Sequence, residues 1–197
     1  MYLKKAKKEN IMATFITGKK VVLRTLTRDD LPALTEWIND PEITQYLNMY
    51  HPMMFESEEQ WYEKLIDSTT NFVLAIETKD EKKNFIGTMG ILQIDHRNQR
   101  AATGALLGDK KCHGRGYGTD AKMHLLHWAF RELNLRKVRS SVLATNHRSK
   151  RYLEKTGYRQ IGVRKEDHLL RGRFVDEILM EVFRDDFMEI WEAYSRE

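Results

Sequence analysis

Hydrophobic and polar residues change period several times along the chain. Apolar residues alternate over 21–26, as in a half-buried strand, whereas 71–77 is apolar on both faces, as in a strand inside a sheet. From Ala121 to Leu133 they recur every four positions, which is typical of a helix. The pattern predicts strands at 21–26, 71–77, 84–94, 100–108, 138–144, 157–164 and 174–183. It predicts helices at 27–38, 39–47, 56–66, 117–133, 146–156 and 185–194. Helices interleaved with strands indicate an α/β or α+β fold around a mixed sheet.

Length and composition favour one domain with a real core. The chain has 197 residues, 41% of them hydrophobic and 10% aromatic, with 3 prolines. We expect a basic, disordered tail over 1–13, with Met12 as a candidate alternative start, and a single domain over 14–197 that ends in a helix. The basic start has no apolar segment behind it, and no apolar run approaches the ~20 residues of a membrane span. We therefore expect a soluble, cytoplasmic protein without a membrane partner.

The charge is distributed unevenly, although the net charge is only +4. The segment 131–173 is strongly basic and 174–197 is acidic. Such asymmetry is compatible with nucleic-acid binding, but also with a basic face for an anionic small molecule followed by a solvated acidic helix. The basic residues are spread over several expected elements, which favours the second interpretation, so no specific nucleic acid is expected as a partner.

The most informative segment is His113-Gly-Arg-Gly-Tyr-Gly-Thr-Asp-Ala, between a predicted strand and the long helix. Its three glycines permit backbone conformations that a Cβ would forbid, at the point where the first amides of a helix have no internal partner. Such a junction is an anion site, and Lys110, Lys111 and Arg115 add positive charge. Neither the Walker spacing nor the dinucleotide-binding spacing is present. The alternative is that the glycines only form a tight turn.

Residues 113–118 resemble the Gln/Arg-x-x-Gly-x-Gly/Ala acetyl-CoA signature of GNAT N-acetyltransferases. The continuation is similar to the branch related to ribosomal-protein alanine N-acetyltransferases, called RimJ/RimL-like. Two further segments match in the family's order: Leu23-Arg-Thr-Leu-Thr-Arg-Asp-Asp with Trp37-Ile-Asn-Asp-Pro-Glu-Ile, and Asn146-His-Arg-Ser with Leu153-Glu-Lys-Thr-Gly-Tyr. The resemblance covers roughly 20–183.

The resemblance implies a GNAT fold, with a mixed sheet of about seven strands, helices on both faces, and acetyl-CoA in a V-shaped opening between central strands. The residues that it implies for cofactor binding are Leu106, Leu107, His113, Gly114, Arg115, Gly116, Tyr117, Gly118, Thr119, Asn146 and Ser149. Backbone N–H groups near Leu106 and Leu107 would meet the oxyanion. Two positions depart from the pattern: His113 replaces Gln or Arg, and Leu153 stands where many members have a catalytic tyrosine. Tyr152 should face about 100° away from it on a helix.

The resemblance also implies direct attack of an amine on the acetyl-CoA thioester. Ala101-Ala-Thr-Gly-Ala lacks the acidic residue that RimJ/RimL-like members often place there, so the base is open. Ser149 is a candidate to hold the cofactor or protonate the thiolate, or else caps a helix with Asn146. Asp176 is a candidate to orient the acceptor amine, or else forms a structural salt bridge. Cys112, the single cysteine, excludes disulfides and lies too near the pyrophosphate loop to be a nucleophile.

No metal site is expected. His124 and His127 lie three apart on the long helix but have no third ligand beside them in the sequence. His51 and His168 fall in loops near the expected acceptor side and are more typical of surface histidines than of bases.

The function that these observations favour is acetyl-CoA-dependent N-acetylation of a primary amine. The acceptor is left open between a protein N-terminus, a polyamine, an aminoglycoside and an amino sugar or amino acid. Segment 29–67 holds ten acidic residues against one basic residue, Lys64, which suits a cationic acceptor or simply forms solvated helix faces. An N-terminal α-amine, with a pKa near 8, is easier to deprotonate than an alkyl amine. The alternative is a non-catalytic acyl-CoA-binding or ribosome/RNA-associated module. A homodimer through the last helix is a further expectation.

Overall fold

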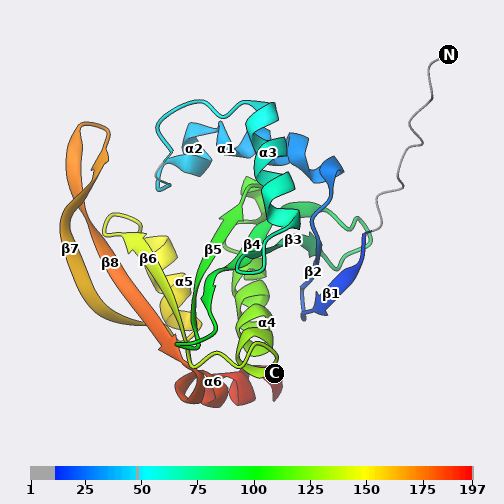
Figure 1. Ribbon diagram of the computed structural model, residues 1–197, viewed down its shortest axis with the longest axis vertical. Coiled ribbons are helices and arrows are strands. Elements are labelled where there is room, and N and C mark those ends of the chain that lie inside the picture. The colour runs from blue at the N-terminus through cyan, green and yellow to red at the C-terminus, as the bar shows by residue number, and fades with distance from the viewer. Residues whose placement is uncertain (1–11, 48, 197) are drawn as a thin grey trace.

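The computed structural model describes residues 12–47 and 49–196, so most of the tail expected over 1–13 lies outside the described residues. The described residues form an eight-stranded sheet in the order β1-β2-β3-β4-β5-β6-β8-β7 (Figure 1). The strands are β1 (Thr14–Thr17), β2 (Val21–Thr25), β3 (Phe72–Thr78), β4 (Phe85–Asp95), β5 (Arg100–Leu107), β6 (Lys137–Leu143), β7 (Arg159–Leu170) and β8 (Arg173–Phe183). Neighbouring strands run antiparallel except β5 and β6, which run parallel, and the expected mixed sheet is therefore confirmed.

The prediction of seven strands missed β1 and shortened β7. Strand β1 is an edge strand whose residues are mostly exposed, including Phe15, so its sequence lacks a buried alternation. Strand β7 continues six residues beyond the expected end at Arg164 and is also mostly exposed. It is held by its register with β8 in a long hairpin that projects from one side of the molecule (Figure 1).

Helices cover both faces of the sheet. Their bounds are α1 (Leu31–Ile38), α2 (Pro41–Thr44), α3 (Phe55–Ile66), α4 (Tyr117–Arg131), α5 (His147–Lys155) and α6 (Arg184–Arg196). On one face, α1 packs its leucines against Ala75 of β3, with α3 beside it. On the other face, α4 supplies much of the larger core, joined by Leu153 of α5 and Phe187 of α6. No helix of the described residues is long and apolar enough to cross a membrane.

Asp120, in the first turn of α4, fixes this helix to two other elements. Its carboxylate is 2% exposed and accepts the backbone N–H groups of Lys19, Lys20 and Val21 at 3.0, 2.7 and 3.0 Å, together with the hydroxyl of Tyr194. Burial opposes ionisation, but these hydrogen bonds outweigh it and hold the pKa of Asp120 below its ordinary value. The N-terminus of α4 is thereby fixed to the β1–β2 turn and to α6.

Strands β5 and β6 separate shortly after they begin. They pair only over Arg100–Ala102 and Lys137–Arg139. Beyond this point β6 remains paired with β8 up to Leu143, while β5 stays with β4 up to Leu107. The two strands therefore diverge within a continuous sheet, and their unpaired edges border an opening.

Candidate functional site

A cleft of about 460 Å³ occupies the opening between β5 and β6. Its walls come from both strands, from the glycine-rich segment, from α4 and α5, and from Ile43, Tyr46 and Leu47 near α2. The predicted cofactor residues that line it are Leu106, Leu107, His113, Gly114, Gly116, Tyr117, Gly118, Thr119, Asn146 and Ser149. Arg115 is not among the lining residues, and its carbonyl accepts the Lys20 ammonium at 3.0 Å. One cleft thus joins segments that are far apart in the sequence.

The glycine-rich segment has the backbone that its composition predicts. Gly114 and Gly116 adopt φ values of +75° and +85°, in the left-handed region that disfavours residues with a Cβ. Gly116 is the residue immediately before α4, and its carbonyl accepts the N–H of Asp120 at 2.9 Å. The preceding amides of the first turn have no intrahelical acceptor and adjoin the cleft. The positive end of the helix and these amides form an anion site there.

His113 ties this segment to the end of β5. Its Nε2 lies 2.8 Å from the carbonyl oxygen of Leu107, and its Nδ1 lies 3.0 Å from the guanidinium of Arg148. Because a guanidinium can only donate, Nδ1 accepts and Nε2 carries the proton that binds the carbonyl. His113, which stands where the family pattern has Gln or Arg, therefore connects the glycine-rich segment to β5 and to Arg148.

The start of α5 is both a capped helix N-terminus and part of the cleft wall, the two roles that the sequence left open for Asn146 and Ser149. Asn146 caps the helix, since its Oδ1 accepts the N–H of Ser149 at 3.0 Å. Both residues also line the cleft. Tyr152 does not face away as expected from its helical position: it lines the cleft together with Leu153.

Asp176 and Cys112 have partners that argue against a role in chemistry. Asp176 accepts the Lys165 ammonium at 2.8 Å and the Glu166 N–H at 2.9 Å, which lowers the pKa of its carboxyl, and it is not among the residues lining the cleft. The structure therefore shows the salt bridge that was the alternative. Cys112 lines the cleft, but burial and the nearby Asp109 carboxylate raise the pKa of its thiol to about 11. It is a thiol rather than a thiolate at neutral pH.

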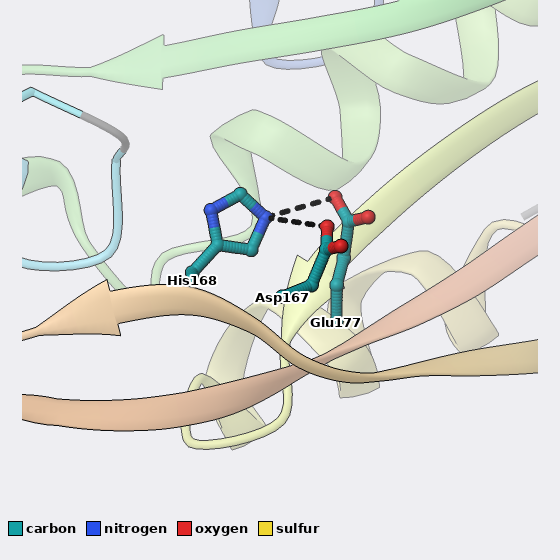
Figure 2. Close-up of side chains that lie close together, drawn as sticks. All are labelled: Asp167, His168 and Glu177. Carbon is teal, nitrogen blue, oxygen red and sulfur yellow. Dashed lines mark ion pairs between the residues drawn. The ribbon is translucent and has the colours of Figure 1, made fainter.

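A second polar cluster lies on the β7–β8 hairpin beside the cleft (Figure 2). The His168 ring points its Nε2 at both Asp167 and Glu177, at 3.5 and 3.6 Å. Glu177 accepts the hydroxyl of Ser141, a cleft residue, at 2.6 Å and the guanidinium of Arg164 at 2.6 Å. Burial disfavours the charged form of Glu177, but these two bonds outweigh it and lower the pKa of its carboxyl.

The sequence analysis did not single out Glu177, and it expected His168 to be a surface residue. The alternation of β8 was the available signal, since Glu177 and Asp176 point to opposite faces of a strand. The three side chains are also the described His, Cys, Asp and Glu residues that come close enough to share a metal ion. Both oxygens of Glu177 are already engaged by Ser141 and Arg164, which does not favour a metal. The absence of a metal site stays a prediction.

Lys122 lines the cleft and was likewise not expected there from the sequence. It is 1% exposed, and no carboxylate lies within ion-pair distance of its ammonium among residues 12–47 and 49–196. Its Nζ lies 5.7 and 5.8 Å from the ring centroids of Tyr152 and Tyr158. Burial lowers its pKa to about 7. Its position four residues before Leu126 and eight before Phe130, in a second apolar row of α4, was the signal that could have revealed it.

The hydroxyl groups of the two tyrosines near Lys122 differ in their hydrogen bonding. Tyr158 shares a hydrogen bond of 2.7 Å with the Thr103 hydroxyl, at the point where β5 leaves β6. The Tyr152 hydroxyl is buried and has no hydrogen-bond partner in the described part of the chain. Burial raises the pKa of both tyrosines above the ordinary value.

A helix N-terminus with free amides that opens into a gap between two diverging strands has the features of an anion-binding site. The comparisons identify the class. A model of the acetyltransferase (GNAT) domain matches residues 20–159, so the chain belongs to the GNAT acetyltransferase family. It is an N-acetyltransferase that depends on acetyl-CoA, and the alternative of a non-catalytic module is not supported.

Individual relatives are distant but nearly full-length. The chain is 26% identical over 182 residues to the uncharacterised N-acetyltransferase p20 of Bacillus licheniformis, covering 89% of this chain and 99% of the relative. It is 26% identical over 160 residues to the human alpha/beta-tubulin-N-acetyltransferase 9, covering 75% and 76%. A structure of the Vibrio cholerae spermidine N-acetyltransferase with CoA and spermine superposes with a TM-score of 0.78 at 24% identity, covering 85% and 98%. This last likeness confirms the GNAT fold.

Proposed function

We propose that the protein transfers an acetyl group from acetyl-CoA in the β5–β6 cleft to a primary amine of a small polyamine-like acceptor. The observation that carries the proposal is that the glycine-rich anion site and the diverging strands line one cleft. The amides at the start of α4 would bind the pyrophosphate, and the pantetheine arm would run along β5 into the opening. The N–H groups near Leu106 and Leu107 would receive the oxyanion.

The proposed reaction needs no acyl-enzyme. Cys112 is held as a thiol, and the amine would attack the thioester carbon directly. A tetrahedral intermediate forms, its C–S bond breaks, and the sulfur must receive a proton as CoA leaves. The RimJ/RimL-like branch is the part of the family that we propose for this chain. Asn146 and Ser149, at the start of α5, are proposed to contact the cofactor.

Support for a cationic acceptor comes from beside the cleft, because the described residues that line it include Lys122, Arg148, Arg151 and Lys155 but no aspartate or glutamate. Several acidic residues of segment 29–67 are already paired: Asp30 with Arg24, Glu63 with Arg28, and Asp40 and Glu42 with Lys110. The remaining support comes from Asp167, and from Glu177, which is joined to the cleft wall through Ser141 but is itself paired with Arg164. The spermidine acetyltransferase of Vibrio cholerae is a structural neighbour that acts on such an amine.

An alkyl ammonium with a pKa near 10.4 must lose a proton before it can attack, at a cost of about 4–5 kcal/mol at pH 7. His168 and Glu177 are proposed to receive the acceptor's ammonium groups and to orient the one that reacts. The tubulin N-acetyltransferase likeness keeps a protein amine as the competing acceptor. A cytoplasmic location and a homodimer remain predictions.

The proposal is tested by measuring CoA release with a thiol reagent from acetyl-CoA and each of several acceptors: spermidine, spermine, peptides with varied N-termini, aminoglycosides and amino sugars. We expect kcat/KM to be highest with the polyamines, and acetyl-CoA to raise the melting temperature without an acceptor. If kcat/KM were higher with a peptide than with the polyamines, the proposed acceptor would be wrong but the proposed acetyl transfer would stand. Failure of acetyl-CoA to bind would overturn the assignment of the cleft.

A further inference from the structure

The proton that the departing CoA sulfur requires has no donor at the usual family position, because that position holds Leu153. Two groups that line the cleft, the Tyr152 hydroxyl and the Cys112 thiol, are poorly matched to neutral pH. Burial raises the pKa of the Tyr152 hydroxyl well above 10 and that of the Cys112 thiol to about 11. An efficient acid needs a pKa near the working pH, which neither group has.

Lys122 lies deeper in the same cleft than the anion site. It follows Gly118 by four residues on α4, about 6 Å further along the helix axis. The same cleft is lined by Thr103 and Ser140, the first residues after β5 and β6 stop pairing. An arm that enters from the glycine-rich segment and runs between the strands would bring its reactive end toward this place.

The burial of Lys122 is otherwise unexplained. A buried ammonium without a counter-charge is costly, and such groups are normally paired. The titratable groups facing it from other elements are Tyr152 on α5 and Tyr158 before β7, and desolvation is the cause of its shifted pKa. On α4 itself, Asp120 is engaged by the β1–β2 turn and His124 makes an edge-on contact with the Trp191 ring. The cleft is the environment left for its Nζ.

We propose that Lys122 is the proton donor to the CoA sulfur, an inference that rests on the proposed acetyl transfer. As the C–S bond of the tetrahedral intermediate breaks, the sulfur takes a proton from the Lys122 ammonium, leaving a neutral amine and free CoA. The amine regains a proton from the acceptor nitrogen, directly or through solvent, so no other reactant is needed. The unpaired Tyr152 hydroxyl lies beside this path and is placed to hold the sulfur.

The pH dependence follows from the required protonation states. The acceptor must be deprotonated, so the rate rises with pH, whereas Lys122 must be protonated, so the rate falls as pH rises through about 7. We expect Lys122→Met to lower kcat by about 100-fold and to remove the descending limb of the kcat profile. Lys122→Arg keeps a cation but cannot give up its proton in this range, so it should also lack that limb.

A binding measurement separates this inference from the proposed function. Wild-type protein should bind CoA about tenfold more tightly than desulfo-CoA, because the Lys122 nitrogen and the CoA sulfur share a proton in a hydrogen bond that desulfo-CoA cannot form. Lys122→Met should bind CoA and desulfo-CoA equally tightly, and Lys122→Arg should still bind CoA more tightly than desulfo-CoA. Lys82→Met, in the exposed β3–β4 turn, is the control and should match wild type in every measurement.

The outcomes are distinct. Unchanged kcat and pH profile in a folded Lys122→Met would overturn the inference, as would equal binding of CoA and desulfo-CoA by wild type. If Lys122→Met does not fold, the test is the kcat profile of Lys122→Arg: loss of the descending limb supports the inference, and an unchanged profile overturns it. If no acceptor is acetylated yet the CoA preference depends on Lys122, its place at the sulfur stands and the proposed acceptor reaction fails.

Discussion

The proposed donor side and the proposed acceptor side of the cleft are built in different ways. On the donor side, a continuous segment places backbone amides at the start of α4, and glycines at 114 and 116 allow its left-handed turns. On the acceptor side, Ser141 of β6, Glu177 of β8 and His168 of β7 meet only because three strands pair. One side uses main-chain groups of a local segment, and the other uses side chains from distant ones.

The two kinds of site should differ in how strongly they respond to side-chain substitutions. A backbone anion site depends on conformation, so it tolerates changes in most side chains, as His113 in place of Gln or Arg illustrates. A site made of side chains on a hairpin changes with single substitutions. Recognition of acetyl-CoA should therefore be robust except at the glycines, whereas recognition of the amine should respond to individual charges.

The largest effect is expected at Gly114. The backbone of Gly114 has φ +75°, and a Cβ added there would meet no atom within 4 Å. Gly114→Val therefore causes backbone strain and adds bulk at the face where the pyrophosphate would lie. Strain of about 1–2 kcal/mol at a left-handed residue, with the loss of aligned amides, should raise the KM for acetyl-CoA about 30-fold. The KM for the amine should stay within about twofold. Initial rates with each substrate varied in turn measure both.

The matched control is Gly172→Val in the β7–β8 turn. Gly172 has φ +79° and also meets nothing within 4 Å, so it imposes similar strain away from the cleft. It should lower the melting temperature as Gly114→Val does while leaving the KM for acetyl-CoA unchanged. Equal KM values in the two variants would show that the segment is only a tight turn.

A smaller effect is expected at Glu177, on the acceptor side. Glu177→Gln keeps the shape and can still bond Ser141 or Arg164, but it removes the charge. We expect the KM for a polyamine to rise about tenfold, since one charge-assisted contact is lost, with the KM for acetyl-CoA unchanged. The same steady-state assay gives both values.

Glu181→Gln provides the comparison for Glu177→Gln. Glu181 lies four residues further along β8 on the same face and pairs at 2.6 Å with Lys137, which does not line the cleft, whereas Glu177 bonds the cleft residue Ser141. It should change neither KM. If Glu177→Gln raised the KM for acetyl-CoA instead of that for the amine, the division into two sides would be wrong.

The sequence indicated the proposed donor side because its signals are local. Glycine spacing, the cap at Asn146 and the period of α4 need no knowledge of the fold, and ten of the eleven residues assigned to the cofactor line the cleft. The exposed β1 had no burial pattern to read. Glu177 and Lys122 were missed because their roles depend on which strand or helix faces the cleft, which is set by tertiary pairing.

The smallest effect is expected at Asp176, next to Glu177 in the sequence. Adjacent strand residues point to opposite faces, and Asp176 binds Lys165 and the Glu166 amide on the hairpin. Because exposed ion pairs contribute little, Asp176→Asn should change kcat/KM for the amine by less than about twofold. Lys165→Met, which removes the partner, should match it. A loss as large as that of Glu177→Gln would return Asp176 to the acceptor site and extend that side of the cleft along the hairpin.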